Sequence, residues 1–318
     1  MLWAVLALLA VAAAAVTRLE LTDELFDKVR LDVEGERAPS AALPERVPLE
    51  WQVLSQAAAL AQEPYCPMEQ LSLQIGDAEL LWKSEDALFQ SRVSVFRSRT
   101  LGVVLSYEGT DVFTPNGYMK DADFLLVEPA PIFDGVFPEG TRLDRGFQRN
   151  FVQTAGEALP AVKRALAEHN ERRVTVTGHS LGAATGQLAA VRLEHELGRG
   201  TTQYLGFAPP RVGNQKYADY VDEKLGGRFF YAINGDDVVP RLPPRALGYQ
   251  HASGQIWIHP ANSARWQYCP GQENRHCSLA VVPDPAIPLN HLGTYFHTML
   301  GWGPLLCPPG VGNANNMP

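Results

Sequence analysis

The sequence predicts an α/β fold, with a central and mainly parallel sheet flanked by helices. Strand-like and helix-like segments alternate between residues 174 and 234, which is the pattern of βαβ units. Within this region, the stretch VTVTGHSLGAATGQ (174–187) passes directly from a short strand into a helix of small residues. The chain has 318 residues, of which 46% are hydrophobic, so it can bury a substantial core. We expect a single domain of this fold over residues 49–318.

The first half of the domain is predicted to begin with a helix and to continue with strands. Small and apolar residues form one face of the segment 49–62, as in an amphipathic helix. The stretch LGVVLSYEG (101–109) is apolar and continuous enough for a central strand. The expected elements are a helix over Leu49–Gln62, strands over Glu79–Lys83, Arg92–Arg97, Leu101–Glu108 and Asp123–Val127, and a helix over Phe147–His169 with a kink at Pro160.

The second half carries the alternation itself. We expect strands over Val174–Thr177, Gln203–Ala208, Arg228–Asn234 and Gln255–His259, and helices over Leu181–Leu197 and Asn214–Leu225. After Pro240 the chain is rich in loop residues, and a last helix is expected to start near His291.

The N-terminal region indicates secretion. The first sixteen residues, MLWAVLALLAVAAAAV, carry no charge and are too short for a comfortable membrane span. A cleaved signal peptide over 1–16 fits them best, with cleavage near Ala15–Thr17, and a membrane anchor is the alternative. Residues 17–48 are charged and end in APSAALPERVP, which predicts a flexible leader or propeptide. We therefore expect an extracellular protein without a stable membrane span.

Charge and cysteine content narrow the partners. The net charge of −8, without a basic cluster, argues against nucleic acid as a partner, and we expect a monomer. Four cysteines suit an oxidising compartment and can pair in three ways. Cys269 and Cys277 lie close together in a loop, so a local bridge between them is favourable and leaves Cys66 to pair with Cys307. Because finger-like spacing of Cys and His is missing from the sequence, a zinc site is not expected. We expect no other metal or cofactor.

The stretch around Ser180 is typical of a catalytic nucleophile. In a strand–turn–helix with the pattern Gly-x-Ser-x-Gly, the serine lies on a strained corner and its hydroxyl projects from the sheet. Gly178 and Gly182 remove the side chains that would block this corner. The following helix begins with free N–H groups. The N–H of Leu181 is therefore a candidate donor to the oxyanion that forms in acyl transfer.

A serine nucleophile needs a histidine base and a carboxylate that orients the base. In this topology the order along the chain is Ser, Asp or Glu, then His. Asp236 and Asp237 follow the predicted strand over 228–234 and are both candidates. His291 is preferred as the base because it precedes the last predicted helix, behind the loop PDPAIPLN (283–290). The other downstream candidates are His251, His259, His276 and His297.

With GHSLG, APPRVGN, GDDVVPRLPP and NHLGTYF in this order, the chain resembles the fungal class 3 lipases over roughly 66–307. These are secreted α/β-hydrolases that include triacylglycerol lipases and feruloyl esterases. The resemblance implies that Ser180, Asp237 and His291 form the triad, with Asp236 as the second choice of acid. It also implies that Thr110, after Gly109, joins Leu181 in the oxyanion hole. The bridge expected between Cys66 and Cys307 matches the family as well.

Two features depart from the family. Glu108 stands where the family usually carries Arg before the oxyanion Gly. The segment expected to form the lid, DVFTPNGYMK (111–120), contains Pro115 and Asn116-Gly117, which break helices. The departure in the lid bears on which ester the protein accepts and leaves the expected catalytic reaction unchanged.

The residue patterns and the resemblance together imply three possible functions. The first is a secreted triacylglycerol lipase that acts through an acyl-enzyme. The second is a feruloyl esterase or another soluble carboxylesterase on the same fold. The third is a non-catalytic lipid-binding protein, for which the loss of a triad residue would be the mark, and every triad residue is present.

Overall fold

The computed structural model describes residues 38–84, 91–110, 124–283 and 289–311. The predicted signal peptide (1–16) and the predicted lid (111–120) lie outside the described residues, as does most of the predicted leader.

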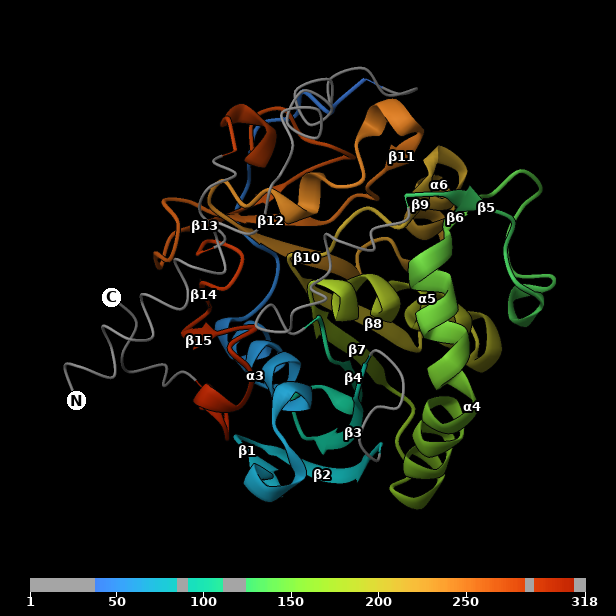
Figure 1. The fold of residues 1–318 in the computed structure, drawn as a ribbon, viewed down its shortest axis with the longest axis vertical. Coiled ribbons are helices and arrows are strands. Elements are labelled where there is room, and N and C mark those ends of the chain that lie inside the picture. The colour runs from blue at the N-terminus through green and yellow to red at the C-terminus, as the bar shows by residue number, and fades with distance from the viewer. Residues whose placement is uncertain (1–37, 85–90, 111–123, 284–288, 312–318) are drawn as a thin grey trace.

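The centre of the described chain is a nine-stranded sheet in the order β1-β2-β3-β4-β7-β8-β10-β12-β13 (Figure 1). The pairings β4–β7, β7–β8, β8–β10 and β10–β12 are parallel, whereas both ends of the sheet are antiparallel. The central, mainly parallel sheet is thus confirmed. The strands are β1 Gln74–Ile75, β2 Ala78–Lys83, β3 Val93–Ser98, β4 Gly102–Tyr107, β7 Val174–His179, β8 Thr202–Phe207, β10 Phe229–Asn234, β12 Gln255–Ile258 and β13 Trp266–Cys269.

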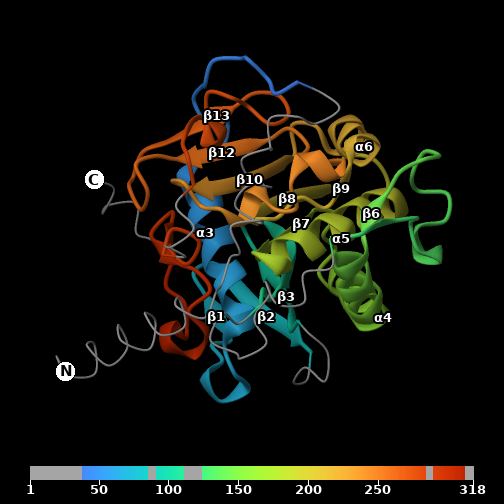
Figure 2. The ribbon, with the colours of Figure 1, turned by 45° about the horizontal axis from the view of Figure 1, so that its top comes forward.

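Helices cover both faces of this sheet (Figures 1 and 2). Successive side chains of a strand point to opposite faces, and β4 shows this directly. Val103 and Leu105 pack with α4 and α5, whereas Val104 packs with α3 on the other side. The helices are α3 Trp51–Gln62, α4 Arg145–Glu168, α5 Leu181–Leu197 and α6 Gln215–Leu225, and α4 runs without a break through Pro160.

The shorter elements lie around this sheet. A second sheet, in the order β11-β9-β6-β5, joins segments that the sequence pattern did not single out, apart from the predicted strand over 123–127. Its strands are β5 Leu126–Val127, β6 Leu143–Asp144, β9 Gly213–Asn214 and β11 Tyr249–Gln250. Single-turn 3₁₀ helices are Glu63–Tyr65, Met68–Gln70, Pro131–Phe133, Val239–Arg241, Arg245–Leu247, Ser278–Ala280 and Gly303–Leu306.

The last helix, expected to start near His291, is not formed, so this prediction was wrong. His291 lies in a turn, and the chain continues as a hairpin of β14 (Thr294–Tyr295) and β15 (Thr298–Met299). Phe296 and His297 make the connection with φ values of 47° and 72°, which a helix cannot contain. The β-branched and aromatic residues of GTYF favour a strand over a helix.

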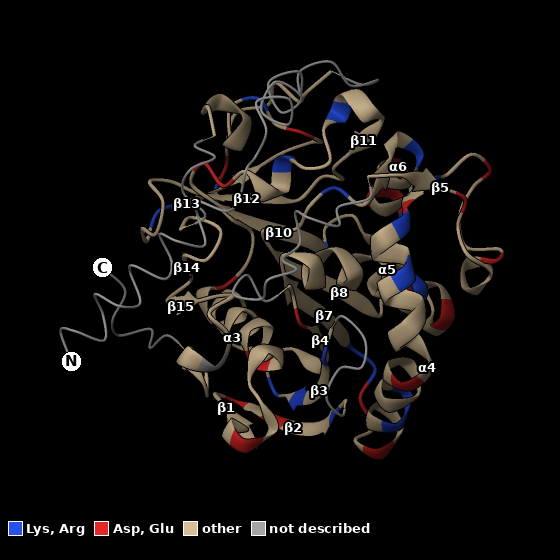
Figure 3. Cartoon of the chain, in the orientation of Figure 1, with Lys and Arg blue, Asp and Glu red and all other residues tan. Residues whose placement is uncertain are grey.

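The described end of the predicted leader is bonded to the domain. The backbone of Glu45 pairs with that of Tyr268 in β13, with N···O distances of 2.8 and 2.9 Å, and Val47 is buried. Two disulfides join distant and local parts of the chain, Cys66–Cys307 and Cys269–Cys277. Among the residues in the four described ranges, no helix combines the length and the apolar character needed to cross a bilayer. Acidic and basic residues are interspersed over the described part of the chain (Figure 3).

Candidate active site

Ser180 lies on a strained corner between β7 and α5. Its φ of 57° and ψ of −125° fall in a region that L-residues rarely adopt. The neighbouring glycines allow this corner to form: a Cβ atom on Gly182 would lie 2.3 Å from the carbonyl oxygen of Tyr107, and one on Gly178 would lie 2.7 Å from the backbone of Gly182. Only glycine therefore fits at these two positions.

The structure brings Ser180, His291 and Asp237 together. The Oγ atom of Ser180 lies 2.8 Å from Nε2 of His291, and Nδ1 of His291 lies 2.9 Å from Oδ2 of Asp237. A carboxylate only accepts hydrogen bonds, so Nδ1 carries the proton of the neutral ring. The unprotonated Nε2 then accepts the hydroxyl proton of Ser180. All three side chains are buried, which strengthens these interactions.

The two candidate acids point in different directions. Asp237 follows β10, and its Oδ1 atom accepts the N–H of Val239 at 3.0 Å, which leaves Oδ2 for His291. The Oδ1 atom of Asp236 instead accepts a hydrogen bond from the side-chain amide of Asn290. The geometry therefore shows which of the two adjacent carboxylates bonds to His291, a choice that the residue pattern left open.

The other downstream histidines have different surroundings. His251 bonds to the carbonyl of Pro240, His259 stacks on Trp257, and His297 packs against Trp51. His276 lies in the loop closed by Cys269 and Cys277.

Comparison with known proteins gives the family. The family model described as "Lipase (class 3)" matches residues 104–247. The chain is 42% identical over 272 residues to the secreted mono- and diacylglycerol lipase LIP4 of Malassezia restricta, covering 85% of this chain and 90% of that protein. It is 40% identical to the secreted mono- and diacylglycerol lipase MDL2 of Malassezia globosa, with 88% and 92% covered. The chain belongs to the class 3 lipase family.

Solved lipase structures agree with this assignment. The lipase of Rhizopus microsporus var. chinensis superimposes with a TM-score of 0.69 at 27% identity, covering 83% of this chain and 93% of that one. Another structure, described as a serine protease triad forming the catalytic centre of a triacylglycerol lipase, has a TM-score of 0.67 at 25% identity, with 78% and 95% covered. The protein is thus an α/β-hydrolase and a secreted lipase, that is, a carboxylic ester hydrolase whose substrate is a lipid or ester.

Leu181, one of the two expected oxyanion residues, adjoins Ser180, and Gly109, which precedes the other, lies close to it. Leu181 is the first residue of α5 and follows Ser180 directly. Gly109 approaches from β4: a Cβ atom built on it would lie 3.2 Å from the Cβ of Ser180. Thr110, the next residue, is half-buried. The turn after β4 and the start of α5 therefore meet at the nucleophile.

His179 is a residue of the site that the pattern analysis missed. Its Nε2 atom lies 2.9 Å from the carbonyl oxygen of His291, and its Nδ1 atom lies 2.9 Å from the hydroxyl of Tyr65. Because a carbonyl only accepts, Nε2 donates the proton and Nδ1 accepts from Tyr65. Burial first, and then the neighbouring His291, hold the pKa of His179 well below its ordinary value. The sequence signal for His179 was its place between Gly178 and Ser180 in the Gly-x-Ser-x-Gly pattern. Nothing in the sequence singled out Tyr65.

Glu108, where the family usually carries Arg, has a positively charged partner in this lipase. The guanidinium of Arg92 contacts both carboxylate oxygens, at 2.6 and 2.9 Å, and the N–H of Arg92 adds a third bond at 2.9 Å. Arg92 also donates to the carbonyl of Tyr65 at 3.0 Å. The charge at this position is reversed relative to the family, yet it is compensated inside the protein.

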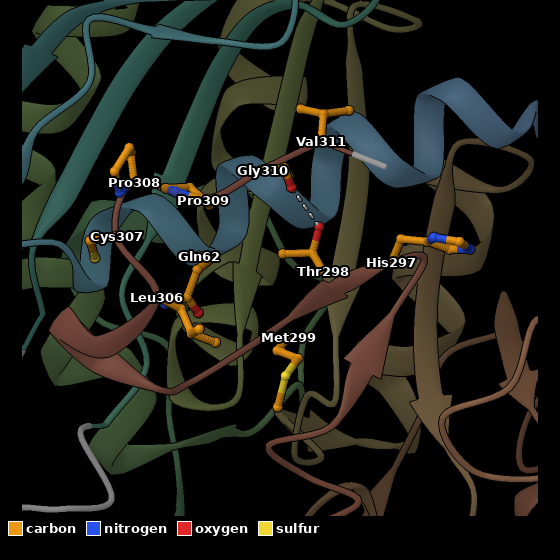
Figure 4. A pocket seen from close by; sticks show the side chains of 10 residues that line it. All are labelled: Gln62, His297, Thr298, Met299, Leu306, Cys307, Pro308, Pro309, Gly310 and Val311. Carbon is orange, nitrogen blue, oxygen red and sulfur yellow. Dashed lines mark hydrogen bonds between the residues drawn. The ribbon is translucent and has the colours of Figure 1, made fainter. Parts of the chain in front are cut away.

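A cavity of about 540 Å³ lies beside the C-terminal hairpin (Figure 4). Residues 297–299, residues 306–311 and Gln62 line it, so it is separate from the triad. Thr298 donates to the carbonyl of Gly310, and Gln62 binds the backbone of Gly301 and Gly303. Two of its polar side chains are therefore bonded within the protein.

No group of three His, Cys, Asp or Glu residues in the described part of the chain could hold a metal ion.

Proposed function

We propose that this lipase hydrolyses acylglycerol esters with Ser180 as nucleophile, His291 as base and Asp237 as orienting acid. The continuous chain of hydrogen bonds from Ser180 Oγ to Asp237 Oδ2 carries the proposal. It sets the tautomer in which His291 can accept the hydroxyl proton, and geometry of this kind is the first requirement for a general base.

The reaction follows from these positions. As Oγ of Ser180 attacks the ester carbonyl, its proton passes to Nε2 of His291, and Asp237 stabilises the imidazolium that forms. The backbone N–H groups of Leu181 and Thr110 hold the tetrahedral oxyanion, each worth about 3 kcal/mol of barrier. His291 then returns the proton to the leaving glyceride oxygen. Water repeats the attack on the acyl-enzyme, which releases the fatty acid and restores Ser180.

The acyl substrates are proposed to be glycerides. The relatives at about 40% identity are named as mono- and diacylglycerol lipases, whereas the triad structure was described for a triacylglycerol lipase. None of these names points to feruloyl esters or to a non-catalytic protein. We propose that triacylglycerols are substrates and that partial glycerides are cleaved as well.

We also propose that the mature lipase acts as a monomer at a lipid–water interface. In this proposal residues 1–16 are a signal peptide, 17–48 a leader and 49–318 the catalytic domain. N-terminal sequencing of the secreted protein tests the boundaries, and light scattering tests the monomer.

The decisive experiment measures hydrolysis of tributyrin, dibutyrin and monobutyrin through the solubility limit of tributyrin. A sharp rise at the limit supports interfacial action, and a smooth saturating curve contradicts it. Ser180→Ala should remove the rate with all three substrates and the labelling by an alkyl phosphonate. Stoichiometric labelling of the folded Ser180→Ala protein would contradict the assignment of the nucleophile.

A further inference from the structure

Three buried residues outside the triad form what we name the Arg211 cluster: Arg211, Glu273 and His251. Arg211 is fully buried. Its Nε and Nη2 atoms donate to the two carboxylate oxygens of Glu273 at 2.7 and 3.0 Å. The N–H of His251 also donates to Glu273, at 2.8 Å. Burial alone would raise the pKa of Glu273, but the charge and hydrogen bonds of Arg211 lower it to about 2.

This cluster binds the loop that follows the triad acid. Four successive carbonyls of residues 240–243 accept hydrogen bonds from it. His251 Nε2 donates to residue 240 at 2.8 Å, the N–H of Arg211 to residue 242 at 2.7 Å, and Arg211 Nη1 to residues 241 and 243. The same loop begins with Val239, whose N–H holds Oδ1 of Asp237 at 3.0 Å. The orientation of Asp237 therefore depends on a segment that the cluster holds.

Glu273 is itself held from two sides. It lies in the loop closed by the Cys269–Cys277 disulfide. Ser40 binds this loop from the described end of the leader, through its N–H to residue 272 at 3.0 Å and its hydroxyl to residue 270 at 2.8 Å. Asn274 donates to the carbonyl of residue 42 at 3.0 Å. The counter-ion of Arg211 thus belongs to a cross-linked and clamped loop.

The positive charge is also needed for the carbonyls. A buried ion pair contributes little net stability compared with apolar residues of similar volume, so the pair is not explained by stability alone. Arg211 supplies several donors in a planar arrangement, which matches two carbonyls and one carboxylate at once. A shorter or uncharged side chain at this position would leave buried carbonyls without donors.

We propose that the Arg211–Glu273 pair positions the loop of residues 239–243 and, through it, the carboxylate of Asp237 toward His291. This inference rests on the proposed function. Arg211 and Glu273 do not touch the reacting atoms, so they are positioning residues. Their effect on the rate should pass through Asp237.

The test is a double-mutant cycle on the full-length secreted protein, with soluble p-nitrophenyl butyrate as substrate. Glu273→Gln keeps the shape of the side chain and removes its charge. In the otherwise unchanged lipase it should lower kcat by about 10- to 100-fold, the scale of a small misplacement of a catalytic group, with little change in KM. In an Asp237→Ala background it should cause no further loss. The matched control is Glu194→Gln, which removes the buried charge that pairs with Arg228 at 2.7 Å, and it should leave kcat unchanged.

Two results would overturn the inference: an unchanged kcat of Glu273→Gln, or the same fold-loss in both backgrounds. If Asp237→Ala itself leaves kcat unchanged, the proposed function fails instead. Arg211→Lys serves as the second variant, because it keeps the charge but cannot reach the carboxylate and both carbonyls together. The same cycle applies to it if Glu273→Gln does not fold, as judged by near-ultraviolet circular dichroism.

Discussion

The ring of His179 holds the backbone of His291, the proposed catalytic base. Nε2 of His179 lies 2.9 Å from the carbonyl oxygen of His291, and the two rings are tilted by 37° with their centroids 4.6 Å apart. The residue before the nucleophile therefore supports the base, although 112 positions separate the two histidines. Tyr65 completes the arrangement by donating to Nδ1 of His179 at 2.9 Å.

Tyr65→Phe should destabilise the lipase and lower its activity. The substitution leaves Nδ1 of His179 buried without its donor, which costs about 1–3 kcal/mol. Urea unfolding measures the free energy, and kcat with a soluble ester measures the effect on the base. Tyr220→Phe, which alters a ring of α6 that packs against Phe137, is the control and should change neither. Equal stability of Tyr65→Phe and the unchanged protein would contradict this account of His179.

The contribution of His251 to stability should be lost in acid. Burial is the largest cause that lowers the pKa of this histidine, from 6.5 to about 4, so the unfolded chain binds its proton more readily than the folded one. The contribution is fully present above pH 6.5 and declines as the pH falls toward 4. The buried Asp144 acts with the opposite sign, since desolvation raises its pKa to about 6. Both the unchanged lipase and His251→Gln contain Asp144, so its contribution cancels in the difference between their unfolding free energies.

That difference should shrink steadily between pH 6.5 and pH 4. Urea unfolding at four pH values in this range provides the measurement. A difference that stays constant with pH would show that His251 keeps its usual proton affinity inside the protein.

Adjacent substitutions test which carboxylate is the triad acid. Asp237→Ala should reduce kcat by about 10³- to 10⁴-fold, because His291 loses the partner that sets its tautomer. Asp236→Ala should cause a far smaller loss, because its side chain binds Asn290 instead. Steady-state kinetics with p-nitrophenyl butyrate compares the two variants at equal folded concentration. A larger loss from Asp236→Ala would reverse the assignment.

The two disulfides should differ in what their removal affects most: stability for the long bridge and activity for the short one. Cys66–Cys307 spans 241 positions and Cys269–Cys277 spans 8, so chain entropy predicts losses of about 5 and about 2–3 kcal/mol, respectively. Replacing both cysteines of the long bridge by alanine should therefore lower the melting temperature more. Replacing both cysteines of the short bridge should lower kcat more, because Glu273 lies in its loop. Calorimetry gives the melting temperature of each double variant, and kinetics at a temperature below both melting temperatures give kcat. The reverse order in either quantity would contradict the prediction.

Local patterns were sufficient for most of the central sheet and its helices. The predicted helix over Leu181–Leu197 has the observed bounds, because apolar strands and small-residue helices alternate there without ambiguity. Apart from the predicted strand over 123–127, the second sheet was missed because its strands of two residues each are too short to show a period. The prediction of a helix at His291 was wrong because the hairpin there depends on positive φ values at Phe296 and His297. The sequence gives no sign of a positive φ where the residue is not glycine.

The sequence by itself determined the sharp turn at Ser180, because the strained backbone there depends on nearby glycines and on the helix that follows. It also determined the strands in the parallel centre of the sheet, since buried strands need continuous apolar residues. The residue pattern left Asp236 and Asp237 open and the resemblance favoured Asp237, whose carboxylate the tertiary structure places at His291. Only the tertiary structure showed that His179 and Tyr65 hold the base. These contacts join positions 54 to 114 apart in the chain. No local preference specifies them, because they exist only once strand ends from different parts of the sequence meet at one edge of the sheet.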